Sequence, residues 1–353
     1  MSLIGVFPTL SRDSLLSDLT YHKDINENLA GIIKNDDFGH LLFYGPQGSG
    51  RRTRIRCLLN EIFGKGAGQV HRVTRTLTTD SNKKVEYSML SSVHHVEFAV
   101  GELGDNDIHV MQEIIKEMAQ TRQLNATEGG KQFKVIFIFE ADKLSLPAQH
   151  ALRRTMEKWA ETCKMFLCVD SLLKICDPLR SRCLTIRVPS PTDQEMATDL
   201  KLILDKYFGA PLSVEDINPV LLLSNGNMRR ALILLEVYKQ QGSTSKRMPQ
   251  SYERIIDELV TTILRTQNKD SILAIRGRVN ELLTRMITGS VIIKNMCLGL
   301  TNKMPPHLHT AVWALANEYC YKILLGSKEI FHVEAFVAGV MSIIVSNRSI
   351  NGL

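Results

Sequence analysis

The stretch Leu41-Leu42-Phe43-Tyr44-Gly45-Pro46-Gln47-Gly48-Ser49-Gly50-Arg51-Arg52-Thr53 decides the fold class. An apolar run that ends at Gly45 predicts a buried strand, and residues 52–63 have a helical pattern. Glycines between a strand and a helix let backbone N–H groups wrap a phosphate at the helix N-terminus. The G-x-x-x-x-G frame therefore predicts a nucleotide-binding-type α/β domain, and a chance glycine-rich turn is the alternative. The candidate phosphate-contacting residues are Gly45, Gly48, Ser49, Gly50, Arg51, Arg52 and Thr53.

The residues that follow this frame are wrong for hydrolysis. Arg51 stands at the lysine position, and Arg52 stands where a Ser or Thr hydroxyl should hold Mg²⁺. Thr53 is one residue late, and one residue turns a helix by about 100°, so its hydroxyl is expected to face away from a metal. Arg51 could still contact phosphate, although guanidinium is bulkier and more planar than the lysine point charge.

The acidic side of the predicted site is also incomplete. The apolar run at 134–139 is followed by Glu140-Ala141-Asp142, but Phe139 stands where an ATPase of this kind carries the Mg²⁺-binding Asp. Glu140 survives as a degenerate acidic motif without its metal partner. We therefore expect no Mg²⁺ and no turnover at this chain's own site, whereas binding of ATP or ADP stays open.

Strand and helix patterns alternate through the first half of the chain. Apolar runs at 165–169 and 183–188 join those already described, and helical patterns cover 108–120 and 149–159. This alternation predicts a doubly wound parallel sheet. A Pro-rich turn ends with Thr192 and Asp193, either of which can cap the next helix. The predicted domains are 1–188, then a helical 189–240, a polar linker at 240–251 and a helical 251–353.

Composition bounds the class of protein. The 353 residues are 44% hydrophobic and 23% charged, which is typical of a soluble globular protein of two or three domains. No apolar run of 18 residues occurs and Met1 to Pro8 does not resemble a signal peptide, so we expect no membrane partner. The net charge of +6 is compatible with a polyanionic partner but does not demonstrate one. An odd number of cysteines without a C-x-x-C pair predicts neither a disulfide framework nor a zinc site.

Further motifs resemble one family. Residues 147–159 (PAQHALRRTMEKW) are similar to the A-Q-x-A-L-R-R-T-M-E-K-Y helix of replication factor C small subunits, which are AAA+ proteins of clamp loaders. Residues 178–183 resemble their S-R-C motif, residues 226–232 their lid motif, and residues 325–336 the end subunit whose ATP site is degenerate. The resemblance covers about residues 21–344. It implies an AAA+ P-loop domain with a parallel sheet and helices, then a small helical lid domain and an all-helical C-terminal collar domain.

The resemblance also implies roles for single residues. Arg182 would be an arginine finger that reaches the ATP of the neighbouring subunit, an effect of roughly 10³ to 10⁵ in rate. Arg229 would sense the γ-phosphate from the lid. Asp170 stands where the family usually has Asn, and an acidic group repels phosphates. A surface arginine is the alternative for both Arg182 and Arg229.

The resemblance does not extend to the adenine pocket. Relatives begin with a W-V-x-K-Y-R-P box whose residues line that pocket, whereas this chain reads IGVFPTLSRDSLLSDLT between Leu3 and Tyr21. Pro8 is the one obvious remnant, so base recognition is expected to differ.

The family implies partners and a compartment. These are four other clamp-loader subunits, the sliding clamp PCNA and primer-template DNA in replication and repair, in the nucleus, within a DNA-dependent ATPase complex. DNA contacts would go to the phosphate backbone, and solvated or structural charges are the alternative. An apolar stripe could face the clamp, although a core position is the favoured interpretation. The DNA candidates are Lys116, Arg122, Arg153 and Arg154, and the stripe is Val110, Met111, Ile114, Ile115 and Met118.

Two other functions stay open. A self-sufficient P-loop ATPase, such as a helicase motor, is disfavoured by Arg51, Arg52 and Phe139. A DNA-binding scaffold that has lost nucleotide altogether is favoured by the altered N-terminus.

Overall fold

The computed structural model describes residues 15–34, 38–78, 84–120, 133–208, 214–241 and 252–350. The chain forms two compact units, Met1–Ser243 and Thr244–Leu353, and each is described by itself. The predicted linker at 240–251 and the segment that replaces the N-terminal box lie mostly outside the described residues.

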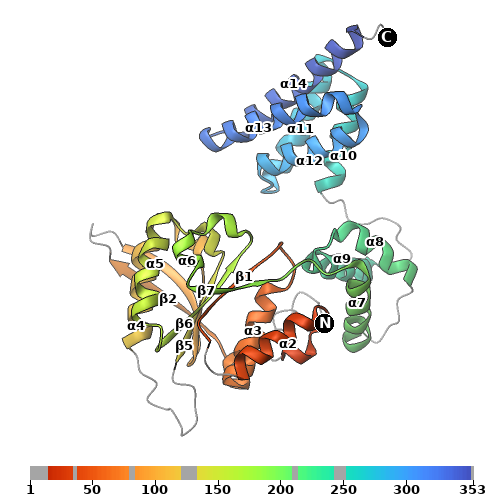
Figure 1. Ribbon diagram of the computed structural model, residues 1–353. Coiled ribbons are helices and arrows are strands. Elements are labelled where there is room, and N and C mark those ends of the chain that lie inside the picture. Colours follow the sequence, from red (N-terminus) through yellow and green to blue (C-terminus); the bar gives the residue numbers. More distant parts are fainter. Residues whose placement is uncertain are drawn as a thin grey trace. The chain divides into compact units, whose positions relative to one another are not determined.

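A seven-stranded sheet forms the centre of the N-terminal unit, in the order β2-β3-β4-β5-β6-β1-β7 among the described residues (Figure 1). The five strands from β4 to β7 in this order are parallel, while β3 pairs antiparallel with both β2 and β4. The predicted sheet is thus confirmed with a mixed edge. The strands are β1 His40–Tyr44, β2 His71–Thr78, β3 Lys84–Ser91, β4 His95–Ala99, β5 Lys134–Phe139, β6 Cys163–Val169 and β7 Cys183–Arg187.

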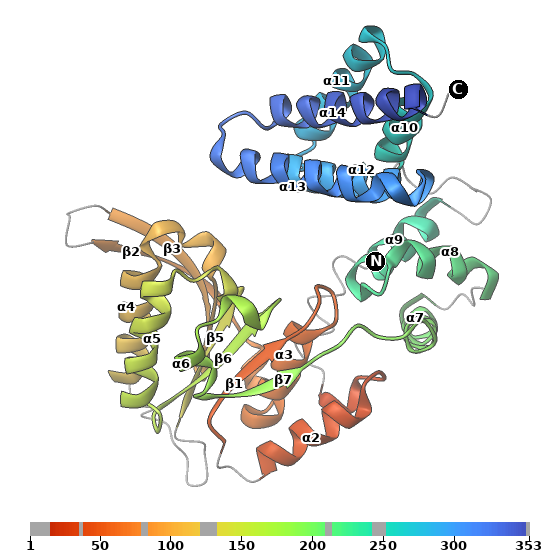
Figure 2. The same ribbon diagram turned by 45° about the horizontal axis from the view of Figure 1, so that its top comes forward.

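Helices cover both faces of this sheet (Figures 1 and 2). Side chains alternate along a strand, so Ile136 and Ile138 of β5 face one layer, while Phe137 and Phe139 face the other. The first layer holds α4 Asp107–Gln120, α5 Leu146–Lys158 and α6 Asp177–Arg180, and the second holds α2 Lys23–Lys34 and α3 Arg51–Phe63. Phe139 and the phosphate-loop helix α3 therefore lie on the same side of the sheet.

Three helices complete the N-terminal unit: α7 Asp193–Phe208, α8 Val214–Ser224 and α9 Met228–Gln241. Thr192 caps α7, because its Oγ1 accepts from the Glu195 backbone while Glu195 Oε2 accepts from the Thr192 backbone. This confirms one of the two predicted caps. These helices belong to the same compact unit as the α/β part, and a separate lid domain over residues 189–240 stays a prediction.

The C-terminal unit is helical, and its helices share one apolar core. Its helices are α10 Tyr252–Arg265, α11 Lys269–Thr284, α12 Gly289–Lys303, α13 His309–Leu325 and α14 Glu329–Ile350. Within the described residues, α14 is long and apolar enough over Glu329–Asn347 to cross a membrane, with a mean hydropathy of 1.6. Val333, Phe336 and Val340 of this helix are fully buried in the core of the unit, as in the core helix of a globular domain.

Short 3₁₀ helices connect the larger elements. They are η1 Leu16–Asp18, η2 Lys65–Gly68, η3 Val100–Glu102, η4 Gly104–Asn106, η5 Ala141–Lys143, η6 Leu172–Lys174 and η7 Pro306–Leu308.

The apolar stripe of α4 lies in the core of the N-terminal unit. Val110, Met111, Ile114 and Ile115 of α4 are at most 3% exposed and belong to the core, with Met118 partly buried against them, so a clamp-facing stripe is wrong for these positions. All seven cysteines are free thiols, and four of them are buried.

Candidate nucleotide site

The phosphate loop lies where the parallel strands end. Tyr44 of β1 is paired with Val169 of β6, so residues 45–50 lie beside Asp170 at the carboxyl edge of the sheet. Gly48 has φ +78° and Gly50, which precedes α3, has φ +86°. Both values lie in the left-handed region that favours glycine. The loop therefore has the backbone of a phosphate cradle at a helix N-terminus.

Arg51 is tied to the end of β6. Its guanidinium donates to the Val169 carbonyl and to Asp170 Oδ1, with 2.5 Å between Nη2 and Oδ1, and only 8% of the residue is exposed. Gln47 Nε2 donates to the other carboxylate oxygen of Asp170 at 2.7 Å. Burial alone would raise the pKa of Asp170, but these two hydrogen bonds and the Arg51 charge lower it. The sequence predicts a repulsive charge at Asp170, whereas in the structure Arg51 compensates this charge.

Arg52 stacks on Phe139. Its Cζ atom lies 3.4 Å from the centroid of the phenyl ring, a cation–π contact. Burial of the guanidinium and the neighbouring charge of Arg56 lower its pKa. Thr53 follows on α3 and is half-buried.

The contact between Arg52 and Phe139 determines whether a magnesium ion fits the site. The position of the metal-binding hydroxyl and the position of the metal-binding carboxylate are filled by a cation and an apolar ring that touch each other. Neither group supplies the oxygen ligands that Mg²⁺ requires. The residues present therefore do not fit the metal.

Glu140 forms an ion pair with Lys143 three residues later in the chain. It has φ +53°, and its Oε2 lies 2.7 Å from the Lys143 ammonium. The hydrogen bond from this lysine to Glu140 raises the pKa of Lys143.

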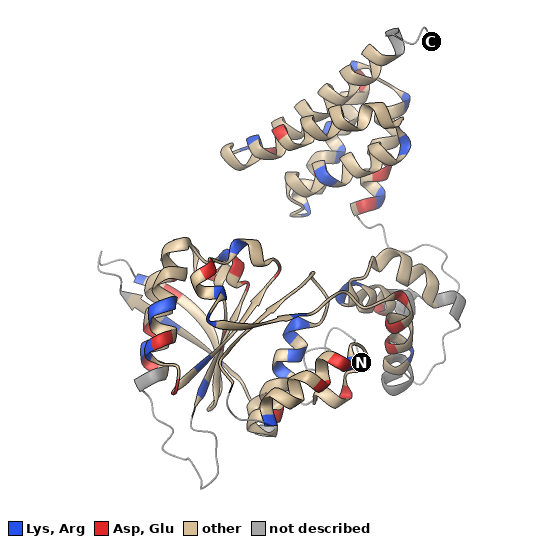
Figure 3. Ribbon diagram, in the orientation of Figure 1, with Lys and Arg blue, Asp and Glu red and all other residues tan. Residues whose placement is uncertain are grey.

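Two further arginines of α3 fix the helix in place, and Figure 3 shows basic residues along it. Arg54 is fully buried and donates to Asn26 Oδ1 and to the carbonyls of Ser49 and Tyr21. The density of arginine in residues 51–56 was visible in the sequence, but its structural partners were not.

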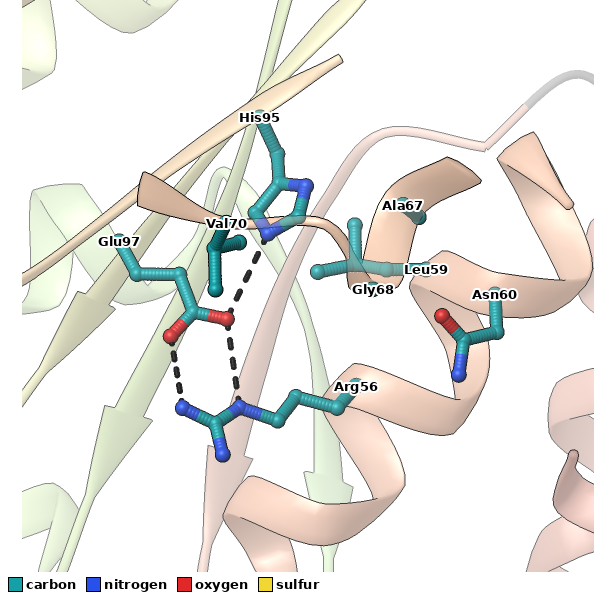
Figure 4. A pocket seen from close by; sticks show the side chains of 8 residues that line it. All are labelled: Arg56, Leu59, Asn60, Ala67, Gly68, Val70, His95 and Glu97. Atoms are coloured by element: carbon teal, nitrogen blue, oxygen red, sulfur yellow. Dashed lines mark hydrogen bonds and ion pairs between the residues drawn. The ribbon is translucent and has the colours of Figure 1, made fainter. Parts of the chain in front are cut away.

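Arg56 takes part in a buried cluster with Glu97 and His95 (Figure 4). Its guanidinium binds Glu97 on β4 with 2.9 Å between Nη2 and Oε2, and His95 Nε2 lies 3.5 Å from Glu97 Oε1. The adjoining cavity has about 10 Å³ of free volume, room for one water molecule and no nucleotide. The cluster is therefore a structural element beside the phosphate loop.

The start of α9 closes on the phosphate loop. The Met228 backbone N–H donates to the Gly48 carbonyl at 3.2 Å. Asn227 caps α9 by accepting from the Arg230 backbone, and a Cβ atom on Gly48 would lie 1.8 Å from its Oδ1. Arg229, the second residue of α9, is exposed, which fits both a phosphate-sensing side chain and a surface arginine, so its role stays a prediction.

Arg182 lies apart from these groups, between α6 and β7. Its Nε donates to Glu157 Oε1 and its Nη1 to the Pro178 carbonyl, each at 2.6 Å. The side chain is 27% exposed and that of Glu157 is 52% exposed. Glu157, at the end of α5, is a contact that the sequence did not reveal.

The candidate DNA-binding residues that the structure describes lie on the surface. Lys116 on α4 and both Arg153 and Arg154 on α5 are exposed. Arg122 lies outside the described residues.

The family follows from comparison with known proteins. The chain is 38% identical over 336 residues to replication factor C subunit 3 of Bos taurus, with 94% of both chains covered, and 38% identical to subunit 5 of Oryza sativa, with 94% and 95% covered. This chain belongs to the replication factor C family.

Other comparisons agree with the architecture. The family model of the replication factor C subunit 3 C-terminal domain matches residues 252–348, and the model of the DNA polymerase III delta subunit matches residues 21–192. A RuvB Holliday junction branch migration motor from Thermotoga maritima has the same AAA+ fold, with a TM-score of 0.50 and 14% identity over 72% of this chain and 80% of the motor. This replication factor C chain thus has both the AAA+ domain and the helical C-terminal domain that the sequence predicts.

Proposed function

We propose that this replication factor C chain does not hydrolyse nucleotide at its own site and completes the ATP site of a neighbouring subunit with Arg182. The contact between Arg52 and Phe139 carries the first half of this proposal, because it fills both metal-ligand positions of the site. Glu140, paired with Lys143, adds to it.

The second half rests on how Arg182 is presented. Its guanidinium is oriented by Glu157 and by the Pro178 carbonyl, yet part of it remains exposed. An exposed ion pair contributes only about 0.2–1 kcal/mol, so exchanging Glu157 for a phosphate costs little. A guanidinium in a water-poor interface stabilises the charge of a transferring phosphoryl group.

The remaining partners follow from the family. We infer that the chain joins four other subunits, through a C-terminal unit whose apolar side chains are in part exposed, and that the assembly loads PCNA onto primer-template DNA in the nucleus. Leu324 and Leu325 of α13 are 79% and 71% exposed, which is expected of a collar surface that other subunits cover. Lys116, Arg153 and Arg154 are the DNA-phosphate candidates.

A nucleotide-free DNA-binding scaffold is the second candidate. The pairing of Arg51 with Asp170 favours it, because the lysine-position cation is already neutralised. A self-sufficient ATPase is disfavoured by the misfit for Mg²⁺ described above.

The test is the DNA- and clamp-stimulated ATPase rate of the reconstituted five-subunit complex. Arg182→Ala is expected to lower this rate at least about tenfold with assembly intact. Arg180→Ala, an exposed neighbour on α6, is the matched control. An unchanged rate for Arg182→Ala would make Arg182 structural and leave the scaffold as the better function.

A further inference from the structure

The two residues that exclude a metal form one unit. Phe139 belongs to the same apolar cluster as α3, and Arg52 of α3 lies with its Cζ atom 3.4 Å from the phenyl centroid. A phenyl ring holds a guanidinium by the negative face of its π system while leaving the N–H edges free to donate. Arg52 is thus a fixed positive charge at the place where the family's metal would be bound.

The positive charge at this junction is only partly compensated, because the acidic charge that acts on Arg52 is that of Glu97, which already pairs with Arg56. Arg51 is neutralised by Asp170, whereas no carboxylate among the described residues pairs with Arg52 or Arg229. Both arginines stand at helix N-termini that the hydrogen bond between Met228 and Gly48 brings together. Each helix adds the positive end of its dipole.

A third group points to a ligand. The Ser49 hydroxyl in the same loop is fully buried and finds no hydrogen-bond partner in the part of the chain that the structure describes. A buried hydroxyl without a partner is costly, and a bound ligand, water or ion would satisfy it.

We propose that this phosphate loop binds the polyphosphate of a nucleotide without a divalent cation, with Arg52, held on Phe139, in the place of the metal. This inference rests on the proposed function only in that the chain's own site does not hydrolyse nucleotide, and it adds binding of the polyphosphate at that site. The guanidinium donates hydrogen bonds to phosphate oxygens but is no Lewis acid, which agrees with binding without hydrolysis. Mg²⁺ on the nucleotide removes negative charge and brings a cation toward Arg52 and Arg229, so it weakens binding.

The experiment measures ADP and ATP binding to the full chain by equilibrium dialysis, in excess EDTA and in excess Mg²⁺. We expect the affinity in EDTA to equal or exceed that in Mg²⁺. Arg52→Ala is expected to weaken binding in EDTA at least about tenfold, since it removes a charge-assisted contact. Phe139→Leu, which keeps an apolar side chain but no π face, is expected to weaken it about two- to fivefold. Arg180→Ala is the control, and thermal unfolding checks that each variant is folded.

A double variant tests whether the charge of Arg52 takes the place of a bound metal ion. Arg52→Thr with Phe139→Asp supplies a hydroxyl and a carboxylate at the two positions, and its binding is expected to require Mg²⁺. If this variant does not fold, the wild-type comparison in EDTA and Mg²⁺ still decides.

The outcomes separate this inference from the proposed function. Wild-type binding that disappears in EDTA, or an Arg52→Ala variant that binds as tightly as wild type, overturns the inference and leaves nucleotide binding in place. No binding under either condition removes both the inference and nucleotide binding, and it leaves the role of Arg182 to be judged by the ATPase of the complex.

Discussion

Glu157 Oε1 accepts a hydrogen bond from Arg182 Nε at 2.6 Å, so the last turn of α5 orients a guanidinium that follows α6. The same α5 helix begins with Ser145 as its N-cap, and its Gln149 accepts from the Cys176 backbone at 2.8 Å. Helix α5 therefore holds, by hydrogen bonds, both the segment that leads to α6 and the Arg182 guanidinium that follows α6.

Glu157→Gln is expected to lower the DNA-stimulated ATPase rate of the five-subunit complex about two- to fivefold, because an exposed ion pair orients Arg182 only modestly. The KM for ATP should change little. Glu161→Gln, an exposed acidic residue after α5, is the control. A loss as large as that of Arg182→Ala, or no loss, would contradict this positioning role.

Gly48→Ala is expected to destabilise the N-terminal unit by at least about 2 kcal/mol, because an L-residue is strained in the left-handed region and overpacking adds to that strain. Its Cβ would lie 1.8 Å from Asn227 Oδ1 and would disturb the junction of the loop with α9. Gly39→Ala is the matched control, since a Cβ there meets nothing within 4 Å. Thermal unfolding of both variants checks the expectation, and equal melting temperatures would refute it.

The ionisation of Glu97 makes the stability of the fold depend on pH in the acid range. Burial would raise its pKa, but hydrogen bonds from His95 and Arg56 lower it from 4.5 to about 2. The folded-state pKa lies below the unfolded value, so the stabilisation is complete above about pH 4.5 and is lost as the pH falls toward 2. By about pH 3 the loss is about 2 kcal/mol.

Urea unfolding of wild type and Glu97→Gln measures this effect. The variant is expected to be about 3 kcal/mol less stable near neutral pH, because Arg56 loses its buried counterion, and the gap should narrow in acid. Glu86→Gln, on the exposed face of β3, is the control. A gap that is constant with pH would show that Glu97 does not titrate in this way.

The ionisation of Asp199 changes the stability of the fold with pH in the direction opposite to that of Glu97. Burial raises its pKa from 3.8 to about 6, although the charge of Arg54 opposes this, and its Oδ1 accepts from the Thr20 hydroxyl. The unfolded chain ionises this group first, so stability falls as the pH rises from 3.8 to about 6 and stays reduced above it.

Asp199→Asn is therefore expected to raise stability above about pH 6, by up to about 3 kcal/mol, and to change it little near pH 4. The amide oxygen can still accept from Thr20. Melting temperatures at the two pH values provide the check, with Glu161→Gln as the neutral comparison. A lower melting temperature above pH 6 would mean that the ionised carboxylate stabilises the fold.

The salt dependence of DNA binding by the five-subunit complex tests the basic residues. Each phosphate contact that is removed should reduce the slope of log K against log salt by about 0.9. Arg153→Ala and Lys116→Ala are each expected to show this reduction, and Arg180→Ala is not. An unchanged slope would remove the residue from the DNA surface.

Buried parallel strands could be predicted because they have a simple sequence pattern. The apolar run at 134–139 coincides with β5, since both faces of that strand are covered by helices. The strands β2, β3 and β4 were missed, and β2 lies at the edge of the sheet. β2 reads HRVTRTLT, and a strand with one neighbour and a solvated face lacks a continuous apolar run.

The site was predictable as a set of positions but not as a set of contacts. Arg52 and Phe139 each stood out as a missing metal ligand, and nothing in the sequence indicated that they touch. The pairing of Arg51 with Asp170 was hidden for the same reason, because only the sheet register brings the ends of β1 and β6 together.

The stacking of Arg52 on Phe139 also affects the paths open to this chain in evolution. Restoring aspartate alone at 139 would set a carboxylate against Arg52 and create an ion pair in the place of the metal. Restoring a hydroxyl alone at 52 would leave an apolar ring where a ligand is needed. On the proposed function, a single substitution at either position would not be expected to restore a metal site, so both positions would have to change together.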